Sequence, residues 1–200
     1  MANIAKILAG IVIFIEIMGI GGAVYTVDET QQVVLTQFGK LVGTPITKAG
    51  LYFKLPFTQT VNYFDKRILE WNGDATQIPT REKKLIWVDT TARWGIADAL
   101  KFMKRIRTEA AAQTRLDDII DSKTREVISS HVLVEAIRNS NRLIEKGELE
   151  ALEDITSEFG KTALAPIEQG REKLSKLILE LAADAVSDYG IELIDVKIKR

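Results

Sequence analysis

The most constraining feature of the sequence is an apolar run from Ile7 to Tyr25, in which Glu16 is the only charged residue. As a helix this run would be roughly 28 Å long at about 1.5 Å per residue, close to the ~30 Å hydrocarbon core of a bilayer. Three interpretations compete: a membrane anchor, a cleaved signal peptide and a buried helix of a soluble domain. The run is long for a signal peptide, and Tyr25 stands where an interfacial aromatic residue is expected. We therefore favour a single-pass anchor over residues 1–25.

Glu16 is the polar exception in this anchor. A charge near the centre of a bilayer is costly, so the carboxyl group is either protonated, in contact with a partner helix, or simply tolerated. Five positions represent the expected anchor: Ile7, Phe14, Glu16, Ile20 and Tyr25. Lys6 precedes the run, whereas Asp28 and Glu29 follow it. Positive charge stays inside, so we predict a cytoplasmic N-terminus and a body on the outer side of that membrane.

The composition excludes several functional classes. The 200 residues carry a net charge of −1, which gives no bulk electrostatic attraction to nucleic acid. The chain has no cysteine, so disulfides, thiol catalysis and cysteine metal sites are absent. It has one histidine, His131, beside Ser129 and Ser130. Neighbours in sequence do not make a catalytic triad, and a structural histidine is favoured over a hydrolase base. We predict no catalytic, cofactor or metal residues.

Strand patterns dominate the chain up to residue 97. β-branched and aromatic residues predict strands at 33–38, Thr58 to Trp71 and 75–79. The clearest strand is Leu85 to Ile96, where Val88, Ala92 and Trp94 fall on one face with a period of two. At Asp98, a good N-cap, the apolar spacing becomes helical.

Helical patterns dominate the remainder of the chain. We expect a helix from Asp98, a second over about 111–128, and a long helix that starts near Pro166 and is closed by Gly190, before a strand over 192–199. Residues 131–137 fit either a strand or a helix. The prediction is an α+β fold behind the anchor, with a mostly β module over 26–97 and a mixed α and β module over 98–200.

An aromatic segment follows the first predicted strand. It contains five large apolar side chains: Leu51, Tyr52, Phe53, Leu55 and Phe57. Pro56 argues against a central strand. One interpretation is a loop that rests on the membrane surface beside the anchor. The other, which we favour from the pattern alone, is a strand whose side chains are buried in the core.

Five segments, in order, resemble the SPFH family of stomatin, prohibitin, flotillin and the bacterial HflK and HflC proteins, and they are most similar to the HflC group. These are Gln32 to Lys40, Ala49 to Phe57, Thr80 to Asp89, Arg93 to Asp98 and Gly190 to Lys199. Each is weak alone, but together they span nearly the whole chain.

The resemblance implies a non-enzymatic scaffold of the bacterial inner membrane. HflC-like proteins pair with an HflK-like protein in a hetero-oligomeric ring and modulate an FtsH-type membrane AAA protease. A stomatin-like or prohibitin-like scaffold that organises membrane lipids is the alternative, and a hydrolase using His131 is the third. The family usually continues into a long coiled coil. This chain stops at Arg200, so it is either a fragment or lacks that element.

Overall fold

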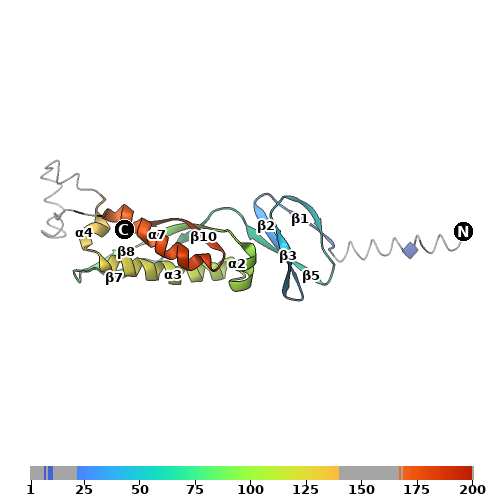
Figure 1. Ribbon diagram of the computed structural model, residues 1–200, viewed down its shortest axis with the longest axis horizontal. Coiled ribbons are helices and arrows are strands. Elements are labelled where there is room, and N and C mark those ends of the chain that lie inside the picture. Colours follow the sequence, from blue (N-terminus) through green and yellow to red (C-terminus); the bar gives the residue numbers. More distant parts are fainter. Residues whose placement is uncertain (1–6, 8, 11–21, 140–166, 168, 200) are drawn as a thin grey trace. The chain divides into compact units, whose positions relative to one another are not determined.

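The computed structural model describes residues 7, 9, 10, 22–139, 167 and 169–199 (Figure 1). The chain divides into two compact units, residues 1–67 with 96–105 and residues 68–95 with 106–200. Each unit combines segments that are distant in sequence. The strands of residues 68–95 pack in the second unit and the helix after Asp98 packs in the first, whereas the sequence placed the module boundary at Asp98.

The first unit contains two small antiparallel sheets. One pairs β1 (Val24–Val27) with β4 (Gly50–Phe53). The other has the order β3-β2-β5, built from Lys40–Ile46, Gln31–Gln37 and Gln59–Asp65. Side chains alternate across β1, where Tyr25 and Val27 are buried and Val24 is exposed.

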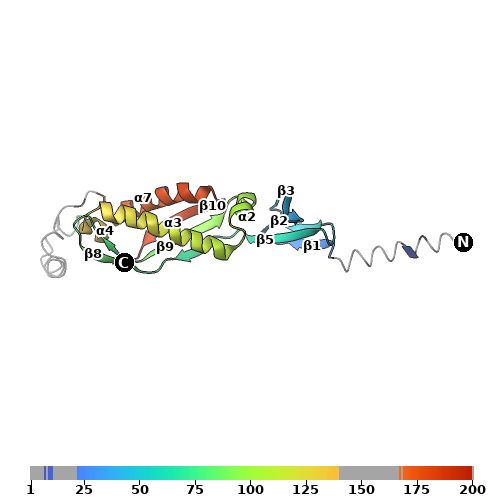
Figure 2. The same cartoon turned by 90° about the horizontal axis from the view of Figure 1, so that it is seen from below.

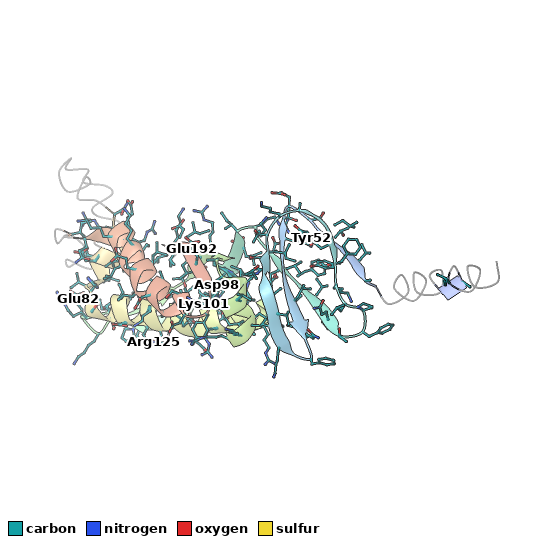
Figure 3. All side chains as sticks on the ribbon, turned by 45° about the vertical axis from the view of Figure 1, so that its right-hand side comes forward. Tyr52, Glu82, Asp98, Lys101, Arg125 and Glu192 are labelled. Carbon is teal, nitrogen blue, oxygen red and sulfur yellow. The ribbon has the colours of Figure 1, made fainter. Side chains whose placement is uncertain are left out.

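The core of the first unit joins these sheets. Tyr25, Val27 and Val33 are buried together, and Tyr52 packs against them. Helix α2 (Ala99–Arg105) covers β2 and β3, with Phe102 packed edge-to-face on Phe64 at 5.3 Å between ring centroids. Asp98 accepts hydrogen bonds from the backbone N–H groups of Leu100 and Lys101, so the predicted N-cap is confirmed (Figure 3).

The expected anchor lies mostly outside the described residues, including Phe14, Glu16 and Ile20. Ile7 is described as helical and exposed. Tyr25 lies in β1 and is buried, so the expectation that the apolar helix extends through Tyr25 is wrong. The reason is local: Val24 to Val27 pair with β4 and alternate between buried and exposed. Within the described ranges, no helix has both the length and the apolar character needed to cross a bilayer.

The second unit is built on the sheet β10-β9-β6, formed by Ile191–Ile198, Thr90–Ile96 and Leu69–Asn72. A separate hairpin pairs β7 (Thr76–Pro79) with β8 (Leu85–Val88). The predicted strand from Thr58 to Trp71 is wrong as one element, because the chain turns at Asp65, whose Oδ1 accepts the Arg67 N–H at 2.8 Å. The predicted strand from Leu85 to Ile96 is also divided, into β8 and β9, which belong to different sheets. Its predicted buried face is confirmed, since Val88, Ala92 and Trp94 are buried.

Two long helices, α3 (Glu109–Ser130) and α7 (Gly170–Ser187), lie along the sheet of the second unit (Figure 2). Helix α7 packs on both β10 and α3. Gly190, with φ of 75°, closes α7 as predicted. Residues Leu133–Ile137 form the short helix α4, which settles the undecided segment as helical. The buried Glu135 accepts hydrogen bonds from the backbone N–H groups of Gln169 and Gly170, and this ties α4 to the start of α7.

Candidate functional site

Large apolar side chains are exposed along one edge of the first unit. Six residues form this apolar edge: Val24, Phe38, Leu51, Phe53, Leu55 and Phe57. Phe53 and Phe57 keep 71% and 79% of their surface accessible. The buried strand that we favoured from the sequence is therefore wrong for Leu51, Phe53, Leu55 and Phe57. An exposed cluster of this kind usually marks a surface that contacts a partner or a membrane.

The ribbon of β1 and β4 positions one half of the apolar edge. Val24 pairs with Phe53, and Thr26 pairs with Leu51. Residues directly opposite one another in an antiparallel pair point to the same face, so Val24, Leu51 and Phe53 share the outer face. Tyr25 and Tyr52 form the pair on the inner face and stack with ring centroids 5.9 Å apart. Tyr52 thus belongs to the core of the unit, and its hydroxyl group donates to the Lys48 carbonyl at 3.0 Å.

The loop between β4 and β5 positions the other half. The Gln59 side-chain oxygen accepts the Leu55 N–H at 2.8 Å, and the Gln59 N–H donates to the Leu55 carbonyl at 3.1 Å. The Lys54 ammonium group also donates to the Gln59 carbonyl at 3.2 Å. These bonds close the loop on itself and leave Leu55 and Phe57 facing outward.

The same loop is tied to the end of the apolar N-terminal run. The Lys54 N–H donates to the Ala23 carbonyl at 2.8 Å. Ala23 is the last residue before β1, and the apolar run of the sequence leads directly into it. The loop that carries Leu55 and Phe57 is therefore held beside the point where that run enters the first unit.

Two phenylalanines of the apolar edge have unusual backbone geometry. Phe57 has φ of 62°, and Phe38, in the β2–β3 turn, has φ of 48°. Positive φ costs an aromatic residue on the order of 1–2 kcal/mol, which an exposed side chain does not recover by packing. Gln37 pairs with Gln59, so the turn and the loop lie at the same end of the β2–β5 pair. Phe38 was not predicted as a site residue, and its one signal in the sequence is its place directly before Gly39 in a predicted turn.

His131 has a structural position at the end of α3. Its Nδ1 lies 2.7 Å from the Val127 carbonyl oxygen, which can only accept, so this nitrogen carries the proton. The Ser130 hydroxyl group donates to the same carbonyl at 2.8 Å. A protonated Nδ1 cannot accept the serine proton, so the nearby pair is not arranged as nucleophile and base.

The fold and the apolar edge together define a class: a mixed α and β protein whose candidate site is a contact surface. The chain belongs to the SPFH domain / Band 7 family, whose family model matches residues 25–200. The match starts at Tyr25 and so includes the whole apolar edge except Val24.

Three curated relatives give the match more detail. The chain is 39% identical to "Protein HflC" of Treponema pallidum, over 88% of this chain and 54% of that protein. It is 36% identical to "Protein HflC" of Borreliella burgdorferi, over 100% of this chain and 62% of that protein. It is 24% identical to "Modulator of FtsH protease HflC" of Escherichia coli, over 94% and 61%. The chain thus spans 54–62% of the length of these relatives.

Proposed function

We propose that this chain is the membrane-anchored part of a non-enzymatic regulator of an FtsH-type membrane protease. The observation that carries the proposal is the match to HflC-named relatives over 88–100% of the chain, one of which is named as a modulator of that protease. The contacts of His131 support a role without catalysis, because its Nδ1, although 3.0 Å from the Ser130 hydroxyl group, bonds to the Val127 carbonyl. The protein works by contact and assembly with an HflK-like partner.

The apolar run and the apolar edge together provide membrane attachment in this proposal. The run up to Ala23 spans the bacterial inner membrane with its N-terminus in the cytoplasm, and the body lies on the outer side. The hydrogen bond from the Lys54 N–H to the Ala23 carbonyl holds the loop of the apolar edge beside the end of this run. This supports contact of the apolar edge with the lipid surface. Burial of one phenylalanine side chain contributes about 1.5–3 kcal/mol. Transfer of Phe53 and Phe57 into lipid therefore outweighs the backbone strain at Phe57.

In our proposal, the two compact units have different roles. The first unit rests on the membrane through its apolar edge. The second unit provides surfaces for the neighbouring protomers of a hetero-oligomer and for the protease. A ring of such protomers limits access of membrane substrates to the protease. This regulation depends on steric exclusion and needs no catalytic residue in the ring.

A reconstitution experiment tests the proposal directly. The chain, an HflK-like protein and an FtsH-type protease are combined in proteoliposomes, and the rate of ATP-dependent degradation of a membrane substrate is measured. We expect a changed rate and co-purification of the three proteins, with a weaker effect for the variant Phe53→Ser. The matched control is Ile68→Ser, which alters another exposed apolar residue, in the second unit and outside the apolar edge.

Two results would contradict the proposal. One is a strictly monomeric chain that leaves the degradation rate unchanged. The other is assembly at the membrane without association with the protease, which would favour the stomatin-like or prohibitin-like scaffold instead.

A further inference from the structure

Strand β8 in the second unit has one open edge. It pairs with β7 on one side, and no strand of the described part of the chain pairs with its other side. Strand β10 runs beside β9, and the Lys199 N–H donates to the Asp89 carbonyl at 2.7 Å, immediately past the end of β8. A strand placed in line with β10 would therefore lie along the open edge of β8. Such edges accept extended segments of other chains.

An apolar groove of about 570 Å³ lies along this edge. Its apolar lining comes from β8, α3, α4 and the end of β10: Leu85, Ile86, Trp87, Val88, Ile128, Ala136, Ile137 and Ile198. Trp87 keeps 58% of its surface exposed, although an indole is among the most favourable groups to bury at an interface. The four residues of β8 match an extended segment about 13 Å long at ~3.3 Å per residue.

The rim of the groove is mainly basic. Arg171 and Lys199 are among its lining residues. The β7–β8 turn leads into Leu85 at the start of the groove, and it carries Arg81, Lys83 and Lys84 against the single acidic residue Glu82 (Figure 3). This turn is held in place, because Thr80 N–H donates to the Lys84 carbonyl at 2.9 Å and Arg81 N–H to the His131 carbonyl at 3.0 Å.

We propose that the groove binds an extended segment of a partner protein, in which apolar residues alternate and acidic residues flank them. The segment adds to β8 as a further strand, its apolar side chains enter the groove, and its carboxylates meet the basic rim. The same surface of a second copy is a poor occupant, because it would bring one basic turn against another. The inference goes beyond the proposed function and does not depend on it.

Trp87 provides a direct readout of binding. The chain has three tryptophans, and Trp71 and Trp94 are 1% and 0% exposed, so acrylamide quenching reports mainly on Trp87. The full chain in lipid nanodiscs is titrated with a short capped peptide in which valine and threonine alternate between glutamate pairs. We expect a blue shift and reduced quenching. A peptide with lysine in place of glutamate, and one with N-methylated central amides, should bind at least about tenfold more weakly.

Two isoleucines of equal exposure provide a matched pair of variants. Ile137 lines the groove and Ile194 lies on β10 outside it, and each is 40% exposed. Ile137→Glu should weaken binding about tenfold or more, whereas Ile194→Glu should leave it unchanged. Circular dichroism checks the folding of both, and Leu85→Glu replaces Ile137→Glu if that variant does not fold.

Three results would overturn the proposal. The first is equal binding of the lysine or N-methylated peptide. The second is an equal loss of affinity in Ile194→Glu. The third is a Trp87 that is already shielded from acrylamide in the free protein, which would mean that another part of the chain fills the groove.

Discussion

Large aromatic side chains are exposed at the apolar edge of the first unit, whereas those on the sheet of the second unit are buried. In the second unit, Trp71 and Trp94 are almost fully buried beneath a layer that includes α3 and α7. In the first unit, Phe53 lies on the short strand β4 and Phe57 in the loop after it, and both remain exposed. The difference is the presence of a covering element. A cluster of large apolar side chains that no element of its own unit covers is favourable to bury against something else. In our proposal, lipid covers the apolar edge in this way.

The largest expected effect is a difference in stability between variants of a buried and of an exposed tryptophan. Trp71→Ala should lower the free energy of unfolding by about 3–5 kcal/mol, because it leaves a cavity in the core. It also removes the indole N–H that donates to Asp117 at 2.5 Å. Trp87→Ala, at an exposed position, should change it by less than about 0.5 kcal/mol. Chemical denaturation measures both, and similar losses for the two variants would mean that the burial contrast is wrong.

A second prediction concerns the covering role of lipid. In nanodiscs, Phe53→Ser should destabilise the β1–β4 ribbon by about 1.5–3 kcal/mol, because the phenylalanine loses its burial in lipid. Hydrogen exchange of the β4 amides measures this change. Leu85→Ser, the control in the second unit, should leave these amides unaffected. Unchanged exchange in Phe53→Ser would show that lipid does not cover the edge.

A smaller effect is expected from the strained backbone of the loop. Asparagine tolerates positive φ better than phenylalanine, and the Phe57 side chain has little packing to lose. Phe57→Asn should therefore raise the free energy of unfolding in detergent by about 0.5–1 kcal/mol while it weakens attachment to lipid. Thermal unfolding tests the gain, and a clear loss of stability would indicate that Phe57 packs inside the protein.

The smallest expected effects concern the pH dependence of stability. As the pH falls, the contribution of one carboxyl group in the first unit and that of one in the second unit change in opposite directions. Hydrogen bonds from Arg67 lower the pKa of Asp65, so its stabilising contribution is lost as the pH falls through that lowered pKa. Burial, with repulsion from Asp117, raises the pKa of Asp121. The charged Asp121 is thus unfavourable at neutral pH, and protonation removes that penalty as the pH falls through the raised pKa.

Two neutral variants test these signs by thermal unfolding. At pH 7, Asp121→Asn should raise the melting temperature slightly, and Asp65→Asn should lower it. Both differences should shrink in acid, once the wild-type carboxyl groups are protonated. A pH-independent difference for either variant would contradict the assignment.

Local patterns in the sequence predicted much of the second unit. The period-two face of Val88, Ala92 and Trp94 and the closure of α7 at Gly190 were predicted correctly, because each depends on neighbouring residues. The break after Asp65 was not predicted. It is stabilised by the Lys66 ammonium group, which donates to the carbonyls of Glu29 and Thr47, and these contacts are distant in sequence.

Most residues of the candidate site could be predicted from the sequence, but their exposure could not, because exposure also depends on contacts that are distant in sequence. The sequence shows that Leu51, Phe53, Leu55 and Phe57 are apolar, and apolar residues are usually buried. Whether they are covered depends on the elements that pack nearby, which composition does not reveal. The backbone geometry of Phe38 and Phe57 likewise has no signal in residue type, since positive φ is rare for phenylalanine.

The most direct test of the central claim compares two leucines of similar exposure, one in each unit. Leu51 is 61% exposed and Leu85 is 64% exposed, and the chain has no cysteine to interfere with single-site labelling. Leu51→Cys and Leu85→Cys are labelled with an environment-sensitive fluorophore, and the full chain is placed in vesicles that contain spin-labelled lipid. We predict strong quenching by lipid at position 51 and little at position 85. Equal quenching at the two positions, or none at position 51, would contradict the assignment of lipid to the apolar edge.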